Sequence, residues 1–142
     1  MAGITVKIEG IKELQEKLSR LRVDANKVED VLYEGAVIYA DEAKRRAPKR
    51  KTGNLKGSIK AKRGKKRGAQ VQTYRSVFTA TDFHKAPHDH LVEFGHDLVR
   101  NGKKVGEVKE HPFFRPAVIA KQAEVEKHVV DGLNGLIEEA TR

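Results

Sequence analysis

Charge is segregated along this sequence, and the segregation restricts the fold to a mildly acidic scaffold that carries one basic segment. Fourteen Lys and Arg residues lie between Lys44 and Arg75, and this stretch has no Asp or Glu. The remaining residues include 15 basic and 20 acidic side chains, although the whole chain has a net charge of +9. Such a segment indicates contact with nucleic acid or with an acidic protein surface, unless it is simply a solvated loop.

The length of 142 residues suits one domain with a single core, so we expect residues 1–142 to fold as one unit. With no Trp and few other aromatic residues, the core must consist mainly of Val, Ile, Leu and Ala. Apolar runs are too short to span a membrane, and we read no secretory signal at the N-terminus. The absence of cysteine excludes disulfides and fits folding in a reducing cytoplasm, as for most cytosolic proteins.

Apolar periodicity predicts three helices. A short helix follows Gly10, and a longer one runs from 25 to 47, with Asp24 as its N-cap and Pro48 ending it. We expect this longer helix to be buried on more than one side. A last helix follows Pro116, with an inner face made of Val118, Val125, Val129, Leu133, Leu136 and Ala140. Gly132 and Gly135 either weaken this helix or let a neighbour pack closely.

The other segments predict short strands, which makes the fold class α+β. Residues 4–8 alternate and predict a strand, and residues 69–80 predict another that forms a hairpin with 58–62. Residues 60–68 have no apolar periodicity and are expected to form an exposed basic loop. A helical turn at 90–94 ends at Gly95, and two strands, 96–100 and 103–109, are joined by Asn101-Gly102, a strong hairpin signal.

Catalytic and metal-binding motifs are weak in this sequence. His84, His88, His90 and His96 lie near Asp82, Asp89 and Glu93, but their spacing matches no zinc pattern. A nuclease would need clustered carboxylates with Mg²⁺, for which Asp82, Asp89, Glu93 and Asp97 are the candidates. No nucleophile motif or phosphate-binding loop occurs. We therefore expect no catalytic residues, no cofactor and no metal.

Three segments, taken in order, carry a family resemblance. They are Ala47-Pro48 with Thr52-Gly53-Asn54-Leu55-Lys56-Gly57-Ser58-Ile59, then Leu91-Val92-Glu93-Phe94-Gly95, then Pro112-Phe113-Phe114-Arg115-Pro116-Ala117. Together they resemble the neck or tail-completion proteins of long-tailed siphophages, the gene-product-ten-like family. The motif residues of interest are Pro48, Thr52, Gly53, Leu55, Ser58, Ile59, Glu93, Phe94, Gly95, Pro112, Phe113 and Pro116.

These motifs also have a physical interpretation. Gly53 and Gly95 would permit backbone angles that a side chain forbids. Leu55, Ile59, Val92 and Phe94 would anchor the turns in the core, and Pro112 and Pro116 would fix the start of the last helix. Glu93 is a charge inside an apolar motif, so it should pair with a Lys or Arg or cap backbone amides. Whether that contact lies within one subunit or between two is open at this point.

The resemblance implies a small antiparallel sheet packed against the long helix and the C-terminal helix. It also implies a structural virion protein, without catalysis, that forms a ring at the head-proximal end of the tail. A hexamer is preferred because siphophage tail tubes are stacked hexamers, although the free subunit could stay monomeric.

The implied partners are other copies of the chain, a head-completion or stopper protein and the major tail tube protein. DNA passing through the channel is a further candidate, and no membrane is involved. The basic residues expected to face a partner or DNA are Lys60, Lys62, Arg63, Lys65, Lys66 and Arg67. The alternative is a non-specific nucleic-acid-binding protein that uses residues 44–75.

Overall fold

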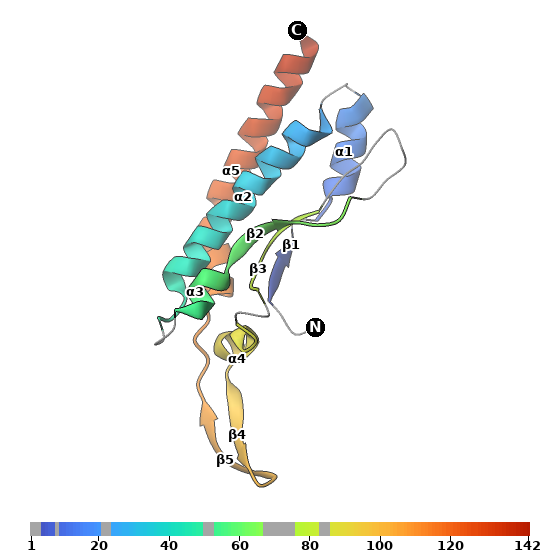
Figure 1. The fold of residues 1–142 in the computed structure, drawn as a ribbon. Helices are drawn as coiled ribbons and strands as arrows, with labels where there is room; N and C mark the ends of the chain where they lie inside the picture. The colour runs from blue at the N-terminus through green and yellow to red at the C-terminus, as the bar shows by residue number, and fades with distance from the viewer. Residues whose placement is uncertain (1–3, 8, 21–23, 50–52, 67–75, 83–85) are drawn as a thin grey trace.

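Two long helices form the spine of the protein in the computed structural model, which describes residues 4–7, 9–20, 24–49, 53–66, 76–82 and 86–142. Helix α2 (Ala25–Arg46) and helix α5 (Phe114–Thr141) lie side by side (Figure 1). A Cβ built on Gly132 would lie 2.6 Å from the Cγ1 of Val31, so this glycine permits close packing. A Cβ on Gly135 would meet nothing within 4 Å.

The other side of α2 supports a three-stranded antiparallel sheet. Strands β1 (Thr5–Lys7), β3 (Val77–Ala80) and β2 (Lys60–Arg63) follow one another in that order across the sheet. The hydroxyl of Thr79 donates a hydrogen bond of 2.7 Å to the carbonyl of Ala36, which fixes β3 on α2. The predicted burial of this helix on more than one side is therefore confirmed.

The loop predicted over residues 60–68 starts later than expected. Residues Lys60 to Arg63 pair with Ala80 to Val77 of β3, as the predicted hairpin requires. The expectation of a loop at 60–63 was wrong because Ala61 packs against the second core cluster, a contact that periodicity cannot reveal. Residues 64–66 have no regular structure, and residues 67–75 lie outside the described residues.

Three short helices complete the body of the protein. They are α1 (Ile11–Arg20) beside the sheet, α3 (Asn54–Ser58) before β2, and α4 (Asp89–Phe94) below the sheet in Figure 1. The side chain of Asp24 accepts a hydrogen bond from the backbone N–H of Asn26, so the predicted N-cap of α2 is confirmed. The mixture of helices and small antiparallel sheets confirms the α+β class.

A two-stranded hairpin projects away from the body (Figure 1). Strands β4 (His96–Arg100) and β5 (Lys103–Val108) pair with each other, with a bulge after Leu98. Asn101 and Gly102 both have positive φ angles, 50° and 74°, as the predicted Asn-Gly turn requires. We call residues 96–108 the arm.

The core consists of two clusters joined along α2. The first gathers residues from α2, α4 and the start of α5, with the residues that directly follow α2 and α3 and the one that precedes α5: Ala40, Ala43, Ala47, Ile59, Val92, Phe113, Phe114 and Ala117. The second lies under the sheet and contains Ile11, Val28, Leu32, Ala36 and Val77. Val129, Leu133 and Leu136 of α5 pack against it, but Ala140 is exposed because it lies in the last turns of α5.

Helix α5 begins at Phe114, three residues before the start that was predicted after Pro116, at Ala117. Pro116 therefore lies inside the first turn of α5. Backbone N–H groups in a first turn have no partner within the helix, so a proline is tolerated there. Pro116 still lies at the start of the last helix, as predicted, but inside its first turn and not before it.

Candidate functional site

Glu93, the charge inside the second motif, is fully buried and caps the start of α5. Its Oε2 accepts hydrogen bonds from the backbone N–H groups of Phe113 at 2.7 Å and Phe114 at 3.0 Å. Its Oε1 accepts one from the N–H of Arg115 at 3.0 Å. These donors have no acceptor within their own helix, and the N-terminal end of a helix dipole favours a negative charge.

Glu93 also pairs with the guanidinium of Arg115. The Nε of Arg115 lies 3.1 Å from Oε1 of Glu93, and one of its Nη groups donates to the backbone carbonyl of Glu93. A second carboxylate, that of Glu110, accepts from Arg115 at 3.1 Å. Hydrogen bonds to Glu110 and then to Glu93 raise the pKa of Arg115 above its ordinary value. Both predicted roles of Glu93, amide capping and pairing, therefore occur within one chain.

Phe94 does not anchor the turn in the core, contrary to the prediction. Its side chain is 59% exposed, whereas Val92 and Phe113 are buried. Phe94 is the last residue of α4, and the inward positions of this short helix are taken by Val92 and Glu93. The guanidinium of Arg115 covers the ring of Phe94, with 5.1 Å between the guanidinium carbon and the ring centroid.

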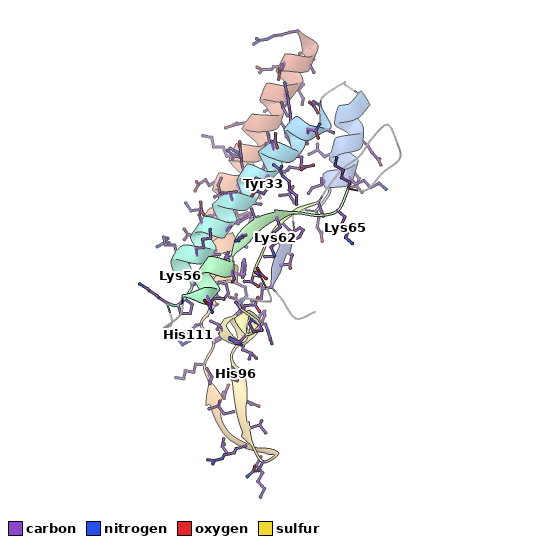
Figure 2. All side chains as sticks on the ribbon, in the orientation of Figure 1. Tyr33, Lys56, Lys62, Lys65, His96 and His111 are labelled. Atoms are coloured by element: carbon purple, nitrogen blue, oxygen red, sulfur yellow. The ribbon has the colours of Figure 1, made fainter. Side chains whose placement is uncertain are left out.

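Gly95 lies at the base of the arm, where the two ends of the arm approach each other closely. Its φ of 71° lies in the left-handed region, as predicted, and a Cβ there would lie 2.6 Å from the carbonyl oxygen of Val108. The N–H of His111 donates to the carbonyl of Val92 at 2.8 Å, so the returning chain is held against α4. Figure 2 shows His96 and His111 on the two chain segments that meet at this base.

Asp89, at the other end of α4, is a second buried carboxylate. Its Oδ2 accepts from the backbone N–H of Ile4 at 3.3 Å and from the hydroxyl of Thr81. Its Oδ1 accepts from the N–H of His90 at 2.7 Å. Sequence reasoning treated Asp89 only as a nuclease or metal candidate and missed this role, because no local pattern brings Ile4, 85 residues away, to this side chain. We call α4 with its Asp89 and Glu93 contacts the clasp.

The first motif forms a compact turn that packs in the same core cluster as Val92 of the clasp. Gly53 has a φ of 63° at the start of α3, as predicted, and Leu55 packs half-buried against the first core cluster. The hydroxyl of Ser58 donates to the carbonyl of Leu55 at 2.7 Å, and Ile59 is fully buried. Pro48 is half-buried just after α2, while Thr52 lies outside the described residues.

The arm exposes apolar side chains on a ribbon of only two strands. Leu98, Val99 and Val105 are all exposed. On the face that carries Val99, the ammonium of Lys104 lies 2.6 Å from a carboxylate oxygen of Asp97 and 3.8 Å from one of Glu107. The arm therefore presents valines beside a cluster with two negative charges and one positive charge.

A recess of about 500 Å³ lies beside the base of the arm. Its apolar lining comes from Pro112, Pro116, Ile119 and Ala120, and its charged lining from Arg46, Glu110 and Arg115. Ile119 is 77% exposed although it lies in this recess. The third motif thus contributes two prolines and an arginine to a surface hollow, while its Phe113 is buried in the core.

The basic residues of the predicted contact loop divide into two groups. Arg63 turns toward α2, where it pairs with Glu29 at 3.2 Å and Asp30 at 2.8 Å and lies over the ring of Tyr33. Lys60 and Lys62 lie on the opposite face of the sheet, because side chains alternate along a strand. Lys56, Lys62 and Lys65 follow the length of β2 and its flanks (Figure 2).

Within the described parts of the chain, Lys60, Lys62, Lys65 and Lys66 form no ion pair. Arg67 lies outside the described residues. By contrast, Lys27, Lys44, Lys104 and Lys121 each have an acidic partner within 4 Å. These four unpaired lysines are therefore available to a partner.

The histidine-rich segment forms no metal centre in the residues that the structure describes: no group of three or more His, Asp or Glu side chains is suitably placed there. His84 lies outside them. None of the helices, as far as the structure describes them, is both long and apolar enough to cross a membrane.

Residues 11–95, more than half of the chain, match a family model described as "Bacteriophage HK97-gp10, putative tail-component". The chain belongs to this HK97-gp10-like family of phage tail components. The resemblance found in the sequence motifs is thereby confirmed. The matched range begins at α1 and ends at Gly95, where the arm begins. No curated protein and no solved structure matches this chain significantly.

Proposed function

We propose that this HK97-gp10-like protein is a structural component of the virion that forms a ring at the head-proximal end of the tail and joins the tail to the head. The observation that carries the proposal is the clasp, which uses two buried carboxylates to hold an exposed apolar arm at a fixed position. A surface of this kind serves protein contacts, since large apolar side chains exposed together mark interaction sites.

The chemistry of the clasp supports binding rather than catalysis. Asp89 and Glu93, two candidate ligands for a nuclease metal, accept N–H and O–H hydrogen bonds on all four carboxylate oxygens. A metal ion would have to displace those donors and leave buried N–H groups unsatisfied. We therefore propose that the protein acts without a catalytic step, a cofactor or a metal.

The ring is proposed to be a hexamer that matches the tail tube. Each copy would contact the next through two different surfaces, the head-to-tail arrangement that closes into a ring. The major tail tube protein would lie on one side of the ring and the head-completion or stopper protein on the other. The channel would then be open to DNA.

The test is deletion of the gene in the bacterium that produces the phage particles. We expect DNA-filled heads and separate tails in electron micrographs, and joined particles again when the wild-type gene is supplied from a plasmid. Normal particles in the deletion strain would refute the proposal. Heads without DNA would also refute it, because they would place the protein before DNA packaging.

The four unpaired lysines favour a second candidate function, non-specific binding to DNA. Replacing Lys60, Lys62, Lys65 and Lys66 with Gln should weaken binding to random duplex DNA and lower the salt slope by about 3 to 4, since each phosphate contact contributes about 0.9. The matched control replaces Lys27, Lys104, Lys121 and Lys127, which lie outside residues 44–75, with Gln and removes the same charge. If both variants lost the same DNA affinity, the net charge alone would explain the binding.

A further inference from the structure

The exposed apolar side chains of this protein gather around the arm. In the described residues, six large apolar side chains are exposed: Phe94, Leu98, Val99, Val105, Ile119 and Val130. Three belong to the arm, Phe94 lies at its base, and Ile119 lies in the recess beside that base. A two-stranded ribbon with no third strand is only marginally stable in water, so the arm should gain stability when a partner covers it.

The arm and the recess are complementary in chemistry. The arm face around Val99 carries Asp97 and Glu107 against one cation, Lys104. The recess carries the partly exposed guanidinium groups of Arg46 and Arg115, which pair with Glu42 and Glu93, and the carboxylate of Glu110. Both surfaces also offer apolar contact, with Val99 and Val105 on the arm and Ile119 among prolines in the recess. Carboxylates on one surface and exposed guanidinium groups on the other, beside matching apolar groups, favour and orient association.

Their positions suit contact between two copies. The arm leaves the body directly after Gly95, and the segment 110–112 at the edge of the recess directly follows β5. The clasp therefore holds both surfaces at a fixed spacing at one end of the molecule. Every copy presents one arm and one recess, which is what a repeating head-to-tail contact requires.

We propose that the arm of one copy docks in the recess of the next copy, with Val99 and Val105 against Ile119, and that this contact closes the ring. The inference rests on the ring of the proposed function and specifies which surfaces form it. The occupant of the recess is thus a second copy of this chain.

Cysteine cross-linking tests the contact, because the chain has no cysteine of its own. The double variants Val99→Cys with Ile119→Cys and Val105→Cys with Ile119→Cys are supplied as the only copy in the phage-producing bacterium. Purified particles are treated with an oxidant or a short bis-maleimide and run on denaturing gels. We expect a ladder that ends at the number of subunits in the ring.

Two controls separate this contact from chance collisions. Val99→Cys alone should give at most dimers, because a head-to-tail contact places two different residues together. Val99→Cys with Val130→Cys should give no ladder, since Val130 is equally an exposed valine but lies about 16 Å further along α5 than Ile119. A ladder from the Val130 pair as strong as from the Ile119 pair would overturn the proposal.

The outcomes distinguish the two proposals. If the double variants are present in joined particles but neither gives a ladder with either reagent, the arm does not dock in the recess, although the ring function stands. If the wild-type protein is absent from particles, the proposed function itself fails. As a second measurement, Val99→Asp should release the full-length protein from particles while its thermal unfolding stays unchanged; normal incorporation would overturn the arm contact.

Discussion

The clasp and the arm are neighbours in sequence but differ in the burial and the contacts of their side chains. In the clasp, buried Asp89 and Glu93 hold hydrogen bonds from within the same chain. In the arm, apolar side chains such as Val99 and Val105 remain exposed. The difference shows that the chain secures its own fold at the base, while the exposed ribbon is the part that we propose contacts a second copy.

Phe113 and Phe94 should give the largest contrast between a buried and an exposed side chain next to the clasp. Phe113→Ala should lower the free energy of unfolding by about 3–5 kcal/mol, because it leaves a cavity in the first core cluster. Phe94→Ala should cost less than about 1 kcal/mol, since that ring is 59% exposed. Urea unfolding monitored by circular dichroism measures both. Similar losses would contradict the burial described for these two rings.

Glu93→Ala should destabilise the protein by about 3 kcal/mol, because it strands three N–H donors and a guanidinium at the start of α5. Glu110→Ala removes the other, exposed partner of Arg115 and should cost less than about 1 kcal/mol. Urea unfolding measures the free energy of unfolding of both variants. A Glu93→Ala protein as stable as the Glu110→Ala protein would show that the cap is dispensable.

Gly95 and Gly102 both have positive φ angles, but only Gly95 is crowded. Gly95→Ala should cost about 2–3 kcal/mol, because its Cβ would lie 2.6 Å from a backbone oxygen. Gly102→Ala meets open space and should cost about 1 kcal/mol from the strained angle alone. Differential scanning calorimetry should show a lower melting temperature for Gly95→Ala than for Gly102→Ala. Equal melting temperatures would argue against the close contact between Gly95 and the carbonyl of Val108.

Changes confined to the arm should leave stability almost unaltered. The double variant Val99→Ser with Val105→Ser should change the free energy of unfolding of the monomer by less than about 0.5 kcal/mol, because both side chains are exposed. Its incorporation into phage particles should nevertheless fall sharply. A strongly destabilised monomer would mean that the arm packs on its own body.

The smallest effect should be present near neutral pH and disappear in acid. Hydrogen bonds from Arg45 and Arg46 lower the pKa of Glu42 from 4.5 to about 2, so its contribution to stability is present above pH 4.5 and is lost as the pH falls toward 2. Glu42→Gln should therefore lower the melting temperature near neutral pH but not near pH 2. Asp97→Asn on the arm is the control, and it should change neither value.

Much of the local structure was predictable because its causes lie within a few residues. The side chain of Asp24 and the Asn101-Gly102 pair act on their own backbone, so the N-cap and the hairpin turn were predicted correctly. The same holds for the positive φ of Gly53 and Gly95. A charge inside an apolar motif was also enough to predict that Glu93 would need a partner.

Other features depend on segments that meet only in three dimensions. Residues 60–63 form a strand because β3 pairs with them, and Asp89 is buried because Ile4 and Thr81 reach it. We predicted from the sequence that Phe94 lies in the core beside Val92, and this was wrong. A six-residue helix has too few positions for the sequence pattern to show which face is buried. The recess also escaped prediction, since α2 and α5 line it together.

The sequence by itself determined the order of the elements, the turns and caps, and the family to which the chain belongs, because these depend on short segments and their spacing. Only the tertiary structure decided which side chains of those segments are buried and which are exposed. Burial depends on contacts between residues far apart in the chain. The projection of the arm beside the recess is therefore a property of the folded molecule.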